Sequence, residues 1–265
     1  EQAFPAACPG CGVIFAKLAE TPVRVTPPAS NADAGVNGAN AAVKGEHTSH
    51  ASEEAVGTLI ARGMELMFYV PSQVSRVNWF GRIALLALFT VWTYFIWRDM
   101  NIPAGDMGSR VLHIILTPFH EAGHYLIFRW FGEFIMILGG TLGQHLFAIV
   151  LGGALLWKRR DPFGAAVFFW VLGFSVSDMG VYMYDAFDPK LMLLDGKTGA
   201  DSDGHDWQNI FGILGLLKSA RGIGVFFGGV GRVMMLLGLV WAAWMLWLQH
   251  GRLSDSPFAE DDVET

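Results

Sequence analysis

The stretch His120-Glu121-Ala122-Gly123-His124 lies inside an apolar segment that runs from about Arg110 to Phe131. Residues four apart share one face of a helix, so His120 and His124 can direct two imidazoles at one metal ion, with Glu121 beside them. Zinc bound by neutral imidazoles lowers the pKa of a water molecule, and a nearby carboxylate can then accept its proton. The pattern therefore predicts a zinc centre in which His120 and His124 are metal ligands and Glu121 is the catalytic base.

The apolar segment around this motif is long enough to cross a bilayer, which takes about 20 residues. Ionisable side chains are costly in such a segment, and those that occur there usually mark a functional site. A structural alternative is that the two histidines only form hydrogen bonds between helices.

These residues resemble the signature of the site-2-protease-like family of intramembrane zinc metalloproteases, which carry His-Glu-x-x-His in a transmembrane helix. Pro118, two residues before His120, can kink the helix and free backbone groups to face a polar cavity. Residues 132–140 also look like the glycine-bounded segment that follows the zinc helix in that family. The resemblance, which covers about Arg110 to Trp207, implies a short re-entrant strand or loop there that presents the substrate.

The composition predicts an all-α polytopic membrane protein with five to six membrane segments. Hydrophobic residues make up 52% of the 265 residues, including ten Trp and twenty Phe, and a net charge of -6 does not suggest nucleic acid as a partner. We expect the protein in a bacterial inner (cytoplasmic) membrane. The expected partners are membrane lipids and either a protein substrate or partner membrane subunits.

The metalloprotease-like membrane domain is expected at residues 76–250. An amphipathic helix on the membrane surface is predicted at 55–75, because apolar residues recur there at helical spacing. Residues 19–54 have the composition of a low-complexity linker, and 251–265 form an acidic tail. Besides the zinc helix, the expected spans are 79–97, 140–157, 163–185 and 225–248, with 210–217 too short to span alone.

Residues 1–18 contain both cysteines of the chain, Cys8 and Cys11. Their Cys-Pro-Gly-Cys spacing resembles one knuckle of a zinc ribbon, but a ribbon needs a second pair. Half of a metal site, a local disulfide and two free thiols therefore remain as alternatives for this zinc-ribbon-like remnant.

Two residues are candidates for a third metal ligand in the membrane domain. Counted from the ends of their segments, His124 and Asp178 both lie about seven residues, or roughly 10 Å, below the same face. The resemblance also implies an aspartate on the second helix after the zinc helix, although the family's Leu-Asp-Gly occurs here as Leu194-Asp195-Gly196 in a polar loop. His205 is the other candidate, because a short half-span could deliver it to the site.

Three further carboxylates are expected to orient a ligand or to serve as alternative ligands. Asp185 is seven residues after Asp178 and lies on nearly the same helix face. Asp203 and Asp206 flank His205, and Asp206 is also well placed to cap a short helix that starts near Trp207.

The function predicted from these patterns is zinc-dependent hydrolysis of peptide bonds in membrane or membrane-adjacent proteins. One alternative is a non-catalytic accessory subunit of a membrane complex that keeps the metal as a structural element. Another is hydrolysis of a lipid amide, which the same zinc chemistry can perform.

Overall fold

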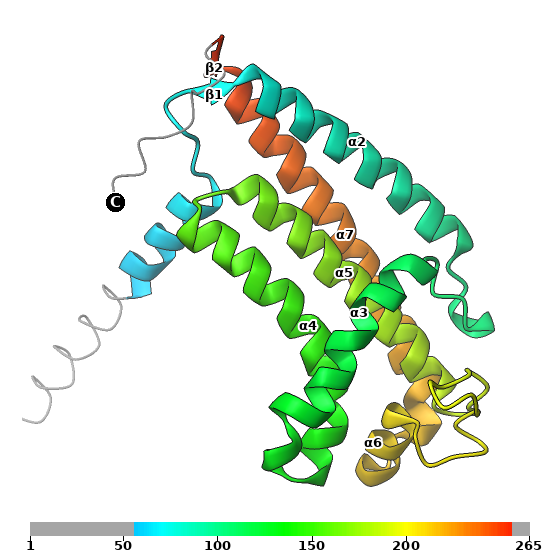
Figure 1. Ribbon diagram of the computed structural model, residues 1–265. Helices are drawn as coiled ribbons and strands as arrows, with labels where there is room; N and C mark the ends of the chain where they lie inside the picture. The colour runs from blue at the N-terminus through cyan, green and yellow to red at the C-terminus, as the bar shows by residue number, and fades with distance from the viewer. Residues whose placement is uncertain (1–55, 256–265) are drawn as a thin grey trace, which may run out of the picture. The chain divides into compact units, whose positions relative to one another are not determined.

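A computed structural model describes residues 56–255 of the chain, and the predictions for residues 1–18, for 19–54 and for most of the acidic tail lie outside this range. The first described residues, 56–67, are helical, as expected for the amphipathic segment. The longer elements that follow are shown in Figure 1 and are α2 (Arg76–Asp99), α3 (Arg110–Ala122), α4 (Glu133–Lys158), α5 (Pro162–Asp185), α6 (Asp206–Leu214) and α7 (Ala220–His250).

Within residues 56–255, four helical segments are long and apolar enough to cross a membrane. They comprise α2, α4, α5 and the segment Leu217–His250 that contains α7. Their many exposed large apolar side chains suit a lipid environment rather than water. The prediction of an all-α membrane protein is confirmed at this level.

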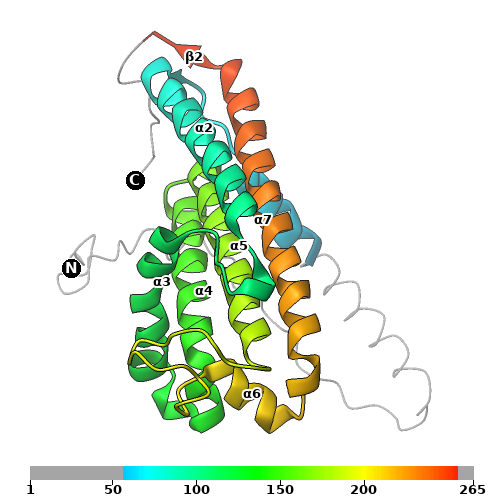
Figure 2. The same cartoon turned by 90° about the vertical axis from the view of Figure 1, so that its right-hand side faces the viewer.

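Helix α5 lies between α4 and α7 in both views (Figure 1, Figure 2). Of its most apolar stretch 67% is buried, against 33% or less for the other three candidate spans, so α5 is the central helix. It packs closely on α7 because Gly173 of α5 meets the backbone of Gly231, where a Cβ atom would clash. Small residues at such crossings let helix backbones approach and gain van der Waals contact.

A short parallel pairing joins β1 (Val74–Ser75) to β2 (Leu253–Ser254). Because β1 directly precedes α2 and β2 follows α7, the pairing places the start of α2 at the end of α7. The two helices then run side by side in opposite directions (Figure 2). This end of the bundle also holds an apolar cluster that includes Phe163 and Leu246, far along the helices from the histidines.

The helix that contains His120 differs in length from its prediction. α3 ends at Ala122 after 13 residues, and the chain continues as a π-helix (Gly123–Ile127) and a 3-10 turn (Arg129–Phe131). π-helical turns occur frequently at functional sites, and this one contains His124. The apolar stretch 110–131 therefore changes helix type after Ala122. It is not one uninterrupted α-helix.

The segment after Phe131 is helical rather than extended. Gly132 has φ of 93° and turns the chain, and α4 then begins at Glu133, so residues 133–140 form its first two turns. Phe134, Ile137 and Leu138 have helical spacing and pack on the apolar cluster around α5 and α6, which explains the helix. The re-entrant strand implied by the resemblance is not found among the described residues.

Candidate metal centre

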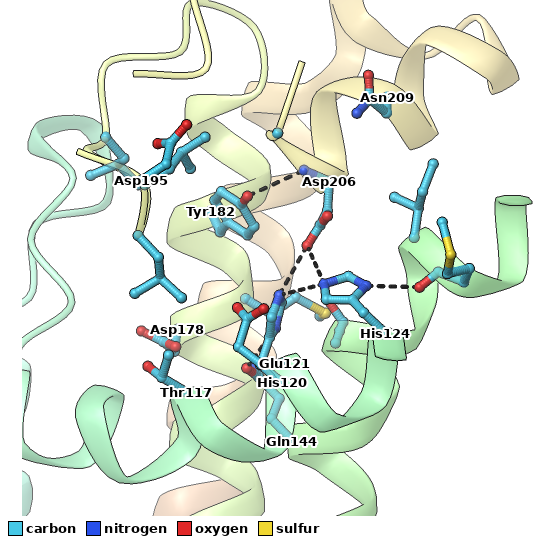
Figure 3. A pocket seen from close by; sticks show the side chains of 18 of the residues that line it. Thr117, His120, Glu121, His124, Gln144, Asp178, Tyr182, Asp195, Asp206 and Asn209 are labelled. Atoms are coloured by element: carbon cyan, nitrogen blue, oxygen red, sulfur yellow. Dashed lines mark hydrogen bonds and ion pairs between the residues drawn. The ribbon is translucent and has the colours of Figure 1, made fainter. Parts of the chain in front are cut away.

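The side chains of His120, His124 and Asp206 converge at one point (Figure 3). The Nε2 atom of His120 lies 2.9 Å from Oδ2 of Asp206, and Nε2 of His124 lies 3.2 Å from the same oxygen. The two Nε2 atoms are 3.1 Å apart. Among the described residues, this is the one group of three or more His, Cys, Asp or Glu side chains that could hold a metal ion.

The remaining ring nitrogens of both histidines face oxygen acceptors. Nδ1 of His124 donates to the backbone carbonyl of Met136 at 2.8 Å, and Nδ1 of His120 donates to Oε1 of Gln144 at 3.3 Å. Gln144 is held in this orientation because its Nε2 donates to the carbonyl of Ser175. A neutral imidazole that donates through Nδ1 carries its lone pair on Nε2. Both histidines therefore present an electron pair to the same point.

Three potential electron-pair donors face one another in this arrangement, and a divalent cation between them would satisfy all three. With bonds of about 2.0–2.1 Å, two ligands of a tetrahedral zinc ion are about 3.3–3.4 Å apart. The three measured separations of 2.9, 3.1 and 3.2 Å are close to that value. The residues therefore fit a small tetrahedral ion with three protein ligands and one free position.

The carboxyl of Asp206 is subject to two opposing influences. Burial disfavours its charged form, but without a bound cation the hydrogen bonds that protonated Nε2 atoms of His120 and His124 donate outweigh burial and hold the pKa of Asp206 below its usual value. The group is ionised at neutral pH, as a metal ligand must be.

Asp206 reaches the histidines because it is the first residue of α6, and its neighbours fix that position. His205 is fully buried and caps the helix, since its Nδ1 accepts from the backbone N–H of Gln208 at 3.1 Å. Nε2 of His205 lies 3.2 Å from Asp185, and the backbone N–H of Asp206 donates to the Tyr182 hydroxyl. His205 thus has the capping role expected for Asp206, and Asp206 occupies the ligand position.

Asp178 does not lie in the metal-ligand group. Both its oxygens lie 3.0–3.1 Å from Nδ1 of His113, two helical turns before His120. The depth match that paired it with His124 assumed a helix ending near Phe131, whereas α3 ends at Ala122. His120 instead lies at the level of Tyr182, one turn further along α5.

Gly140 of α4 lies directly against the two imidazoles. A Cβ atom at this position would overlap the Nε2 atoms of both His120 and His124. The rings can lie side by side only because residue 140 has no side chain.

A cavity of about 730 Å³ contains this group and extends along α3. His120, His124, Glu121 and Asp206 line it together with Tyr182. Met136 and Tyr182 lie three residues from the ends of α4 and α5, so the donor atoms are about 5 Å from the ends of these helices. The centre is therefore near one end of the bundle of candidate membrane spans, and Glu121 lines the same cavity.

Other predicted residues are separate from the three donors. Asp203 lines the cavity, Asp185 acts on His205, and Asp195 accepts the backbone N–H of Lys197 in the loop. Cys8 and Cys11 are outside the described residues.

Gln144 and Tyr182 support the centre but were not predicted to do so. The signal for Tyr182 was present in the sequence, since it lies four residues after Asp178 and three before Asp185, close to the same helix face. Gln144 is likewise a polar residue one turn after Gly140.

Comparisons of the chain with protein families, with curated proteins and with solved structures find no match.

Proposed function

We propose that this protein is a membrane-embedded zinc-dependent peptidase that hydrolyses membrane or membrane-adjacent proteins, related to the site-2-protease-like family. The observation that carries the proposal is the convergence of three electron-pair donors, His120, His124 and Asp206, beside a cavity that also contains Glu121. A bacterial inner membrane, with lipids and protein substrates as partners, is part of the same proposal.

The ligand number favours catalysis over a structural role. Structural zinc sites are usually closed by four protein ligands, whereas catalytic sites have three and an open position. Three protein donors are present here, and a cavity of about 730 Å³ adjoins them. This geometry leaves room for a substrate and argues against a purely structural metal.

Zinc held by His120, His124 and Asp206 would supply a Lewis acid that polarises a carbonyl group and lowers the pKa of water. Glu121 follows His120 on α3 and lines the same cavity, so it can accept a proton from the attacking water and return it to the leaving amine. Gln144 and the Met136 carbonyl hold the two imidazoles in the required tautomer. Tyr182 and His205 keep Asp206 in place.

The first experiment is elemental mass spectrometry on protein purified without chelators, together with peptide hydrolysis. We expect near-stoichiometric zinc that is lost in His124→Ala and kept in His145→Ala, a histidine on α4 outside the donor group. Cys8→Ser tests whether the N-terminal cysteines contribute metal. Glu121→Gln should keep the zinc and lose hydrolysis by at least about 100-fold.

Two results overturn the proposal. Absence of metal in the unaltered protein contradicts the metal centre. Zinc that is bound by His120 and His124 without hydrolysis of any peptide contradicts the activity and points to the accessory-subunit alternative.

A further inference from the structure

The cavity around the metal-ligand group is strongly acidic. No lysine or arginine lines it among the described residues, whereas six carboxylates do. These are Glu121, Glu133, Asp178, Asp195, Asp203 and Asp206. The two imidazoles that converge with Asp206 on its wall, a group that could hold a metal ion, mark the cavity as a candidate ligand site beyond its charge alone.

Three of the six carboxylates have a partner or a role inside the protein. Asp206 faces the two histidines, Glu121 stands beside them, and Asp178 binds His113. The other three, which we call the rim carboxylates, are exposed residues: Glu133, Asp195 and Asp203. In the described part of the chain, none of the rim carboxylates forms an ion pair with a lysine or arginine.

The negative charge persists when the centre is loaded. A divalent ion would balance two of the six carboxylates and a proton on His113 one more, so at least three negative charges remain. Low-dielectric walls concentrate such a field and attract ligands of the opposite sign. The field therefore selects for a cationic ligand.

The rim carboxylates are too dispersed to form a second metal site. They come from the start of α4 and from the loop before α6, and no second group of potential metal ligands is found in residues 56–255. In Figure 3 Asp195 lies with Asp178 to one side of Asp206. Charges spread along a cavity suit an extended ligand that carries more than one positive group.

The same loop and α6 also supply apolar surface to the cavity. Met192, Leu194 and Ile213 line it, and they are 76%, 73% and 62% exposed. The centre lies near the ends of the membrane-spanning helices, where positive side chains of membrane proteins commonly flank their apolar segments. A peptide with both basic and apolar residues matches this combination.

We propose that the cavity binds a cationic, amphipathic peptide segment, whose Lys or Arg side chains meet Glu133, Asp195 and Asp203 while its apolar residues contact Met192, Leu194 and Ile213. Cleavage of such a segment rests on the proposed function, whereas its binding does not. Recognition by the rim carboxylates is electrostatic and therefore weakens as salt rises.

The test measures binding by fluorescence anisotropy to detergent-purified, zinc-loaded Glu121→Gln protein, which is not expected to cleave the probe. Two labelled 12-residue peptides share one apolar half and differ in three positions, which are Lys in one and Gln in the other. We expect the Lys peptide to bind about tenfold more tightly, as three partly exposed ion pairs predict. The difference should shrink between 50 and 500 mM NaCl.

Variants then assign the effect to the rim carboxylates. Combining Glu133→Gln, Asp195→Asn and Asp203→Asn should remove most of the preference for the Lys peptide and leave zinc content and Gln-peptide binding unchanged. Asp188→Asn is the matched control, since it removes a carboxylate of the same loop that pairs with Lys190 outside the cavity. Equal binding of the two peptides, or a preference that survives the triple variant, overturns the inference.

The two proposals fail in different ways. Selective binding of the Lys peptide without hydrolysis by the unaltered protein contradicts the peptidase function and supports this inference. Hydrolysis by the unaltered protein, with equal binding of the Lys and Gln peptides, supports the peptidase function and contradicts this inference.

Discussion

The Nδ1 atom of His124 donates to a backbone carbonyl, that of Met136, 2.8 Å away. The Nδ1 atom of His120 donates instead to a side-chain oxygen, Oε1 of Gln144, at 3.3 Å. The tautomer of His124 is thus set by the fold of α4, whereas that of His120 depends on one replaceable residue. Partners of this kind orient metal-bound imidazoles and raise their basicity.

We expect Gln144→Leu to lower zinc affinity by about 10–100-fold, because it removes the acceptor for Nδ1 of His120. Gln144→Glu keeps an acceptor and should retain most of the affinity. Competition with a chromophoric chelator measures the Kd of both variants. Leu142→Ala, at an exposed position of the same helix, is the control. If Gln144→Leu leaves zinc affinity unaltered, Gln144 does not orient His120 for metal binding.

Gly140→Ala tests the close contact between α4 and the imidazoles. The new methyl group overlaps the Nε2 atoms of both histidines, so the rings must move apart. We expect zinc affinity to fall at least about tenfold and the free energy of unfolding to drop by about 1–3 kcal/mol.

Gly153→Ala on the same helix is the matched control, because a Cβ atom there meets nothing within 4 Å. It should leave zinc binding unchanged and can stabilise α4 by up to about 1 kcal/mol. Chelator competition and thermal unfolding in detergent give both quantities. Equal zinc binding by the two alanine variants argues against the contact.

Local sequence patterns predicted the parts of the centre that one helix supplies. The spacing of His120 and His124 puts both on one face whatever the rest of the chain does, and apolar runs mark the spanning helices. Asp206 could be named only as one of several candidates, because its position depends on how the loop between α5 and α6 folds back. Neither the π-helical turn after Ala122 nor the resulting pairing of Asp178 with His113 has a periodicity that sequence reasoning can detect.

Asp185 holds the loop between α5 and α6 through hydrogen bonds. We expect these bonds to affect zinc affinity, although Asp185 is not one of the three candidate ligands. Asp185 accepts the backbone N–H groups of Lys190 and Leu191 and contacts His205, which caps the helix that begins with Asp206. We expect Asp185→Ala to weaken zinc binding by about tenfold and to speed proteolysis of the loop.

Asp185→Asn keeps one acceptor oxygen and should have a smaller effect than Asp185→Ala. Asp188→Ala removes only an exposed ion pair with Lys190 and should leave zinc binding unchanged. Limited proteolysis and chelator competition on the three variants give the order. Zinc affinity that is the same in Asp185→Ala and Asp188→Ala refutes the role of the loop.

Removing the metal should destabilise the folded protein, because the three ligands come from α3, the π-helical turn and α6, and an ion joins them only in the native state. At a free zinc concentration of 100 times the Kd, the expected stabilisation is about 2.7 kcal/mol. Thermal unfolding in detergent, with zinc and after chelation, measures it. Glu121→Gln keeps all three ligands, so zinc should raise its unfolding temperature as much as that of the unaltered protein. His124→Ala should unfold at the same temperature with and without zinc. If His124→Ala is stabilised by zinc as strongly as the unaltered protein, the ion binds elsewhere in the chain.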